Sequence, residues 1–330
     1  MQGRKSNLDF LNSLRLKEER KKNMACTISA DEIKRVKGLG FLNNKGTDLF
    51  NGRVITRNGK ITAQQARVIA DAAEKFGSGE VEFTTRLTVE VRGIHFDNIE
   101  PFREYIAQAG LQTGGTGAMV RPVVSCKGTT CQYGLYDTFA LSEKVHERFY
   151  IGYRGVKLPH KFKIATGGCP NNCVKPNLND LGVIGQRVPN FDPEVCKGCK
   201  KCKIESICPM GAPKVADGKM AIDPNVCIHC GRCDEKCPFG AIKDSQAGYQ
   251  VYVGGRWGKK VAHGKPLSRI FTSEEEVLDT IEKAILLFRE QGVAGERFAD
   301  TIARIGFEEV EKQLLSDEIL TRKEEILAEK

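Results

Sequence analysis

The amino-acid sequence predicts an α+β protein with two domains, the second of which is interrupted by an inserted module. Residues 48–120 alternate strand and helix patterns. Residues 189–246 differ from their surroundings, with eight cysteines and few apolar runs, and strand alternation resumes at 249–253. A chain of 330 residues is long enough for two domains, or for one domain that carries an insertion.

The first domain is expected to be a ferredoxin-like plait. A strand pattern at 52–57 precedes a helix whose start is marked by the capping-box pair Thr62 and Gln65. Two alternating segments over 81–91 predict a pair of strands, and Asp97 is expected to cap a second helix. The resulting order β-α-β-β-α is typical of the α/β plait.

The rest of the chain is expected to form the second domain around the insertion. Short strands and cysteine-bearing loops follow residue 121, and a long amphipathic helix is expected over 273–291. The apolar residues after 306 predict a further helix packed on the surface. The expected parts are a charged N-terminal leader 1–45, the plait 46–117, a second domain 118–188 with 247–330, and the inserted module 189–246.

Composition limits the classes of function. With 40% hydrophobic and 28% charged residues, the chain is ordinary for a soluble protein. No apolar run approaches the roughly 20 residues of a membrane helix, and no signal-peptide core is visible, so the expected location is the cytoplasm. Much of the net charge of +9 lies in segment 1–23, which is expected to be a solvated helix or a frayed tail. No nucleic-acid-binding motif accompanies it, so neither nucleic acid nor membrane is an expected partner.

Thirteen cysteines in such a chain indicate metal sites rather than disulfides, because cytosolic thiols are kept reduced. Twelve fall into tight groups, and Cys26 stands alone as an expected structural thiol. The run from Cys227 to Pro238 has the bacterial ferredoxin spacing C-x2-C-x2-C-x3-C-P, and the run from Cys196 to Pro209 repeats it with a longer last spacer. Crossed ligation then predicts one cluster held by Cys196, Cys199, Cys202 and Cys237, and another held by Cys208, Cys227, Cys230 and Cys233.

Structural zinc is the alternative interpretation of these runs, since CxxC pairs also bind zinc. Zinc sites use four ligands in two pairs and often include histidine. The doubled triplet followed by Cys-Pro favours [4Fe–4S] clusters, and His229 is expected to neighbour a cluster rather than ligate it. Two such clusters conduct electrons and perform no substrate chemistry themselves.

A second cysteine constellation lies outside the insertion and consists of Cys126, Cys131, Cys169 and Cys173. Two separated pairs are compatible with zinc, a cluster, or a group attached to a cofactor. Small residues around Gly168 let the backbone approach a bulky group. Basic residues precede both loops, namely Arg121, Lys161 and Lys163.

On these motifs the chain resembles the sirohaem-dependent sulfite and nitrite reductases. The matching segments are Thr84-Thr85-Arg86, Arg121-Pro-Val-Val-Ser-Cys126, Leu158-Pro-His-Lys161-Phe-Lys163 and Gly168-Cys-Pro-Asn-Asn-Cys173. A single repeat with an inserted ferredoxin is similar to the C subunit of anaerobic sulfite reductase and to the dissimilatory enzymes. The resemblance implies a ferredoxin-like plait plus a sirohaem-binding α/β domain with an inserted bacterial-ferredoxin module.

The resemblance also implies roles for the matched residues. The second constellation would hold a third [4Fe–4S] cluster, with Cys173 bridging to the sirohaem iron. The sirohaem would be bound by Thr84, Thr85, Arg86 and Asn171, and the substrate pocket would be lined by Arg121, Lys161 and Lys163 with Arg53 or Arg57. One departure is that four residues separate Cys126 from Cys131, where the family usually has five.

The implied reaction is the six-electron reduction of sulfite to sulfide. Clustered Arg and Lys suit a cofactor rich in carboxylates and an oxyanion substrate. Nitrite reduction to ammonia is the alternative, although the nitrite enzymes tend to have asparagine where Lys163 stands. An electron-transfer subunit without sirohaem is a further alternative. Because no GxGxxG follows a strand, electrons are expected from a separate ferredoxin or a reductase subunit. The larger relatives contain two repeats, so a homodimer or heteromer is expected.

Overall fold

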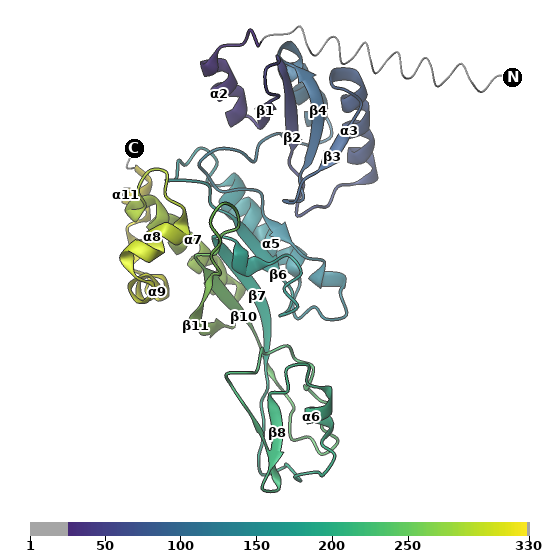
Figure 1. Ribbon diagram of the computed structural model, residues 1–330, viewed down its shortest axis with the longest axis vertical. Helices are drawn as coiled ribbons and strands as arrows, with labels where there is room; N and C mark the ends of the chain where they lie inside the picture. Colours follow the sequence, from purple (N-terminus) through teal and green to yellow (C-terminus); the bar gives the residue numbers. More distant parts are fainter. Residues whose placement is uncertain (1–25, 329–330) are drawn as a thin grey trace, which may run out of the picture. The chain divides into compact units, whose positions relative to one another are not determined.

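The computed structural model describes residues 26–328, and the chain divides into two compact units after Gly117 (Figure 1). The first unit contains one antiparallel sheet in the order β1-β2-β4-β3. Strands β2 and β3 both pair antiparallel with β4, so they run parallel to each other on its two sides. This is the split β-α-β arrangement of a ferredoxin-like plait. The elements are α2 Ala30–Gly38, β1 Phe41–Asn43, β2 Leu49–Val54, α3 Ala63–Phe76, β3 Val81–Phe83, β4 Val89–His95 and α4 Ile99–Ala107.

The starts of the two main helices differ in how well the sequence predicts them. At α3 the capping box is present as predicted, with the Gln65 N–H donating to Thr62 Oγ1 at 3.1 Å. At α4 the prediction that Asp97 is the cap is wrong. Strand β4 continues to His95, and the chain passes through a 3₁₀ turn containing Asp97 before α4 begins. The Asp97 carboxylate lies beside the His95 ring instead.

The predicted leader is also too long. Residues from Ala30 onward form α2 and β1, and Val36 and Phe41 are fully buried in the core of the first unit. The many charged residues of this segment conceal these two core positions in the sequence. Residues 1–23 lie outside the described residues. Cys26 is a free, half-buried thiol whose Sγ donates to the Ile28 carbonyl at 3.8 Å.

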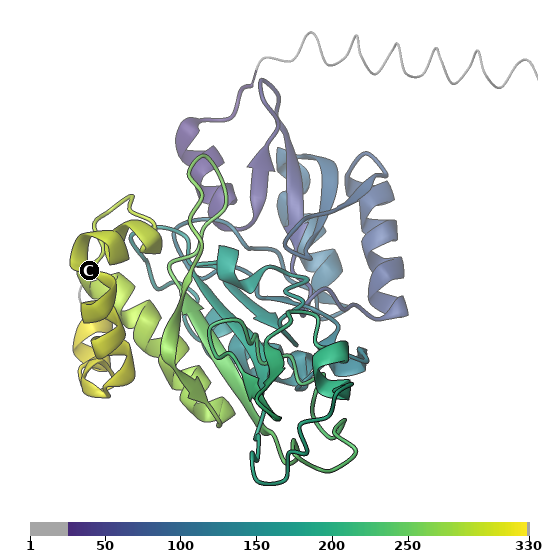
Figure 2. The same ribbon diagram turned by 60° about the horizontal axis from the view of Figure 1, so that its bottom comes forward.

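The second unit is built on a mixed sheet in the order β11-β10-β7-β6-β5. Strands β5, β6 and β7 are parallel, and β10 and β11 are antiparallel additions. The connection between β10 and β11 extends as a long hairpin (Figure 2). No helix among the described residues is long and apolar enough to cross a membrane. The bounds are β5 Val124–Ser125, α5 Thr138–Val145, β6 Ile164–Gly167, β7 Leu181–Val188, β10 Gln246–Val253, β11 Lys265–Phe271 and α7 Glu274–Gln291.

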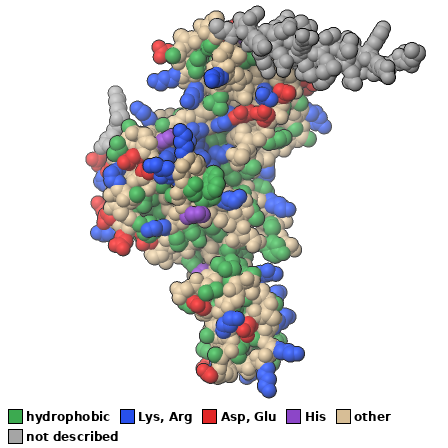
Figure 3. Space-filling model, in the orientation of Figure 1, with side chains coloured by type: hydrophobic (Ala, Val, Ile, Leu, Met, Phe, Trp, Pro, Cys, Tyr) green, Lys and Arg blue, Asp and Glu red, His purple; other side chains and the backbone are tan. Residues whose placement is uncertain are grey.

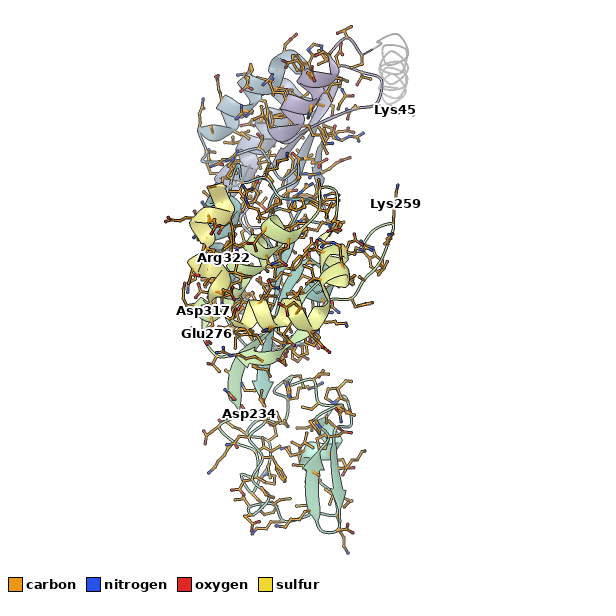
Figure 4. All side chains as sticks on the ribbon, turned by 90° about the vertical axis from the view of Figure 1, so that its left-hand side faces the viewer. Lys45, Asp234, Lys259, Glu276, Asp317 and Arg322 are labelled. Carbon is orange, nitrogen blue, oxygen red and sulfur yellow. The ribbon has the colours of Figure 1, made fainter. Side chains whose placement is uncertain are left out.

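Helix α7 is buried over nearly all of its length between Val277 and Phe288. A surface helix would bury one face only. The chain after 297 explains the difference, because it covers α7 with short helices rather than the single surface helix that the sequence predicts (Figure 1). Asp317 and Arg322 lie on this cover (Figure 4). The short helices are α8 Phe298–Ile305, α9 Phe307–Leu315, α10 Glu318–Thr321 and α11 Lys323–Ala328.

The inserted module joins the ends of two neighbouring strands, since Val188 of β7 pairs with Gln246 of β10. It therefore extends from the sheet without interrupting it (Figure 1). A small core of Ile204, Met220 and Ile242 supports it. Its elements are α6 Lys203–Ile207, β8 Pro213–Ala216 and β9 Lys219–Ile222.

Arg187, near the end of β7, bonds the inserted module to the sheet. The Arg187 N–H donates to the His229 carbonyl at 2.8 Å, and its guanidinium lies 3.4 Å from an Asp234 carboxylate oxygen (Figure 4). A Cβ on Gly231 would lie 2.9 Å from the Arg187 Cβ, so the loop that carries Cys230 packs closely on the sheet.

Candidate functional site

Two predicted cysteine loops begin at the same edge of the second sheet. Strands β5 and β6 are parallel, so their carboxyl ends meet. Cys126 follows β5, and Cys169 follows β6 by one residue. The backbone N–H of Gly168 donates to the Cys126 Sγ at 3.2 Å. The sheet therefore joins two cysteine pairs that are far apart in the sequence.

The short spacing between Cys126 and Cys131 is closed by one 3₁₀ turn, Gly128–Thr130. The Cys131 N–H donates back into this turn at 3.2 Å. A little further on, the Leu135 N–H donates to the Gly168 carbonyl at 2.9 Å, which ties the first cysteine loop to the second. The departure from the family spacing is thus absorbed locally, and both thiols remain on the loop that packs against Gly168.

Glycines let these loops pack backbone against backbone. A Cβ on Gly134 would lie 1.9 Å from the Gly128 carbonyl oxygen, and one on Gly168 would lie 2.9 Å from the Gly128 Cα. We expect Gly134→Ala to displace the first loop, so that anaerobically purified protein loses the iron of one of the three predicted clusters, about one third of the cluster iron. Gly258→Ala, where a Cβ meets nothing within 4 Å, is the control. Equal iron in both variants would contradict the prediction.

The thiols of Cys126, Cys131, Cys169 and Cys173 lie within electrostatic range of one another. Burial raises the pKa of the Cys169 thiol, a hydrogen bond from the backbone of Asn171 lowers it, and the other three thiols raise it. Four thiolates so close together repel one another unless a cationic metal cluster offsets their charge. Cys173 is exposed while the other three are partly buried. This donor set fits an iron–sulfur cluster.

The inserted module contains a second thiol group. Burial and neighbouring thiols raise the pKa of Cys233 to about 11, and the interacting thiols are Cys208, Cys227 and Cys230. These are the four residues that crossed ligation assigns to one cluster. Cys196, Cys202 and Cys237 pack on the module core, where the Met220 N–H donates to the Cys196 Sγ at 3.4 Å. No cysteine in the described part of the chain forms a disulfide.

A cavity of about 190 Å³ lies between the second cysteine loop and the inserted module. Cys169 and Asn171 line it from the sheet side, and Cys230 and Arg232 line it from the module side. Both the thiol group at the sheet and one of the module groups therefore face the same space.

Basic side chains gather near the amino-terminal ends of β5 and β6, away from the thiols. The Arg121 N–H donates to the carbonyl of Phe162 at 2.8 Å, and the Phe162 ring is fully buried. Lys161 and Lys163 flank Phe162, so they share the opposite side of this extended segment. Burial lowers the pKa of Lys161, and the positive charges of Arg297 and Arg121 lower it further. Three cations thus interact here.

A buried ion pair anchors this basic group. Arg297 Nη2 donates to both carboxylate oxygens of Asp180, at 2.9 and 2.8 Å. The backbone N–H of Lys163 donates to the same carboxylate at 2.9 Å. Burial raises the pKa of the fully buried Asp180, while Arg297 opposes that rise. The pair therefore holds the backbone from which the Lys163 side chain extends.

In the first unit, Arg53 and Arg57 differ in their surroundings. Arg53 Nε donates to Glu90 at 2.8 Å, Nη2 contacts the same carboxylate, and Nη1 donates to the Gly115 carbonyl at 3.1 Å. Arg57 is exposed at a tight turn in which Asn58 has a φ of 58°. Arg53 is thus fixed in orientation.

The segment Thr84–Arg86 forms the turn between β3 and β4. The Leu87 N–H donates to the Thr84 carbonyl at 3.1 Å, and Thr84 Oγ1 accepts from the Arg86 N–H at 3.2 Å. Thr85 is exposed at the tip. Hydrogen bonds to Thr84 therefore hold the turn together, and of its three residues Thr85 is the exposed one.

Sequence reasoning missed four residues of these arrangements: Glu90, His160, Asp180 and Arg297. His160 stands inside the quoted lysine motif, and that position was an available signal. Burial and the adjacent cations lower its pKa, which favours the neutral ring. Arg297 and Asp180 are distant in sequence and carry no motif, so only the fold pairs them.

Two known family domains match the chain, one over each of its two compact units. Residues 116–323 match the nitrite and sulphite reductase 4Fe-4S domain, and residues 43–109 match the nitrite/sulfite reductase ferredoxin-like half domain. The chain belongs to the nitrite and sulfite reductase family. This family of oxidoreductases depends on sirohaem and [4Fe–4S] clusters, so the predicted family and fold class are confirmed.

Two relatives and one solved structure are similar to this chain over more than two thirds of its length. The chain is 32% identical over 263 residues to a coenzyme F420-dependent sulfite reductase of Methanocaldococcus jannaschii, covering 78% of this chain but only 41% of that protein. It is 31% identical over 246 residues to the C subunit of the anaerobic sulfite reductase of Salmonella typhimurium, covering 68% of this chain and 69% of that one. A crystal structure of dissimilatory sulfite reductase I has the same fold, with a TM-score of 0.65 and 21% identity over 93% of this chain and 86% of the other.

Proposed function

We propose that this chain reduces sulfite to sulfide with six electrons. The observation that carries the proposal is that two chemically different groups lie at the two ends of one strand. The basic residues end at Lys163, immediately before β6, and the thiol loop begins at Gly168, immediately after it. Four strand residues separate them, a length of about 13 Å. A redox cofactor attached to the thiols is therefore about one short strand away from side chains that suit an anion.

The donor groups fit the cofactors of the family. We assign one [4Fe–4S] cluster to the sheet thiols, where the exposed Cys173 would connect it to the sirohaem, and two further clusters to the eight module cysteines. When bound, this cofactor pair supplies electrons to the sulfur atom of the substrate. Asn171, on the same loop, contributes to the sirohaem site.

The residues of the chain bind the anion and deliver protons. Conversion of hydrogen sulfite to hydrogen sulfide ion and three waters consumes six protons with the six electrons. Arg121, Lys161 and Lys163 supply charged donors to the oxyanion. The lowered pKa of Lys161 makes its ammonium group a better proton donor than an ordinary lysine.

The family resemblance assigns the remaining groups to residues of the first unit. We favour Arg53 over Arg57 as the anion-binding residue, because Glu90 fixes the Arg53 guanidinium in advance and leaves it further N–H groups. The turn of Thr84, Thr85 and Arg86 is proposed to bind sirohaem carboxylates.

Anaerobic purification tests this function directly. We expect a sirohaem absorption band with about twelve cluster irons and one haem iron per chain, as three cubanes and one haem require. Reduced-dye turnover of sulfite should exceed that of nitrite. Cluster iron without a haem band, from cells able to make sirohaem, would instead identify an electron-transfer subunit.

Lys163→Asn tests the choice of sulfite over nitrite. An amide keeps a hydrogen-bond donor but removes the positive charge, so we expect sulfite turnover to fall about 10- to 100-fold, below the range for complete loss of a preorganised donor. Nitrite turnover should fall less, since nitrite carries one negative charge, whereas the sulfite dianion that is in equilibrium with hydrogen sulfite near neutral pH carries two. Lys157→Asn, at an exposed position, is the control. Equal losses for both substrates would remove the argument for sulfite.

The proposed cofactors also require a supply of electrons from outside the chain. We propose that electrons come from a ferredoxin or a reductase subunit and enter through the inserted module. One of the relatives is named as a subunit, which supports assembly into a heteromer, and a homodimer is the alternative.

A further inference from the structure

We propose that a lysine rim on the inserted module is the docking surface for an acidic electron-donor protein. The rim consists of Lys197, Lys200, Lys201 and Lys203. This inference rests on the proposed electron-carrying role of the module, and it adds the place of entry and the charge of the partner.

The two cysteine groups of the module differ in their distance from the sheet. The group of Cys208, Cys227, Cys230 and Cys233 is the inner one, because Cys230 shares the 190 Å³ cavity with Cys169. Its loop is also bonded to the sheet through Arg187. Cys196, Cys199 and Cys202 do not line that cavity. Their group is therefore the outer one, farther from the proposed haem site along the electron path.

The outer group carries the rim. All four lysines lie within or directly after the Cys196–Cys202 segment, and all four are exposed. No ion pair is found for any of them in residues 26–328, whereas the nearby Lys214 lies 3.5 Å from Glu205 and Lys219 donates to the Pro193 carbonyl. Lys and Arg side chains accordingly line one edge of the module (Figure 3).

The outer group also has an exposed aromatic ring near its fourth cysteine in the sequence. Phe239 is 50% exposed and follows Cys237, which packs on the same small core as Cys196 and Cys202. Exposed apolar side chains together with positive charges are typical of transient interfaces that are steered by electrostatics. Glu194 is the one acidic residue between Asp192 and Lys203, so the rim keeps a net positive charge. An acidic redox protein is the partner that this charge fits.

The electron step balances with one donor molecule. A low-potential donor of the ferredoxin class loses one electron and the outer cluster gains it, with no proton or atom transferred. Six such encounters supply one sulfite. Rapid, weak docking suits this repetition better than a permanent interface does.

The test uses the holoenzyme and a small acidic ferredoxin as the probe. Lys197→Glu, Lys200→Glu, Lys201→Glu and Lys203→Glu are combined in one variant, and a second variant has Gln at the same positions. The control variant reverses the exposed lysines Lys34, Lys45, Lys157 and Lys312, which changes the net charge equally. Binding is measured calorimetrically at low and high salt, and iron content confirms that the clusters are intact.

We expect the Glu variant to weaken ferredoxin binding at least tenfold and to abolish its salt dependence, while the Gln variant shows a smaller loss and the control binds as the wild type does. Sulfite turnover driven by a small reduced dye should be unchanged in all variants. Dye-driven turnover therefore tests the proposed sulfite reduction independently of ferredoxin docking. Unchanged ferredoxin binding by the Glu variant would overturn the proposal, as would equal weakening in the control. Binding of nucleic acid but not ferredoxin to the rim would overturn it too.

Discussion

Replacement of Cys173 by serine is expected to reduce sulfite turnover at least about 100-fold, since changes outside the ligand shell alone cost 10- to 100-fold in metal sites. Serine keeps the size of the side chain but removes the thiolate. Cys173 is the exposed thiol of the sheet group, so its loss should uncouple the proposed sirohaem from the proposed cluster. The two clusters proposed for the module have separate cysteine ligands and should persist.

Spectroscopy distinguishes a loss of haem–cluster coupling from a loss of the module clusters. Electron paramagnetic resonance of the reduced variant should retain the module cluster signals and lose the coupling between haem and cluster. Cys26→Ser is the matched control, because this half-buried thiol lies outside every cysteine group. Unchanged sulfite turnover in Cys173→Ser would refute the ligand assignment.

Arg297→Gln is expected to lower the free energy of unfolding by about 3–5 kcal/mol, the usual cost of leaving one member of a buried ion pair without its partner. The Asp180 side chain is fully buried, and that of Arg297 is 13% exposed. The variant leaves the carboxylate with the Lys163 N–H and without its cation. The same change should loosen the segment that carries Lys161 and Lys163, so turnover should fall as well.

A double variant and a pH series test the cause. Arg297→Gln with Asp180→Asn removes both charges and should recover much of the loss in the unfolding midpoint. In the single variant the pKa of Asp180 rises further above its unfolded value, because the opposing Arg297 is gone. The buried carboxyl is then favoured in its protonated form, so the stability defect should shrink as the pH falls and grow as it rises. A defect that is independent of pH, with no recovery in the double variant, would mean that packing rather than charge is responsible.

Local signals in the sequence determined much of this protein. The capping box at Thr62 and Gln65 is present, and the predicted α+β class and family are confirmed. Each of these rests on residues close together in the chain, where helix capping and cysteine spacing act within a few positions. Asp97 is the instructive failure, since the cap of α4 depended on where β4 ended.

The sequence by itself determined which chemical groups the protein has: cysteines spaced for clusters, and basic residues spaced for an anion. Only the tertiary structure decided how they are grouped. Parallel pairing of β5 with β6 brings Cys126 to Gly168, and the fold places Arg297 against Asp180 to hold Lys163. Likewise α7 is buried because the later helices cover it. The physical reason is that burial and strand pairing join residues by their distance in space, whereas motif spacing reports only their distance along the chain.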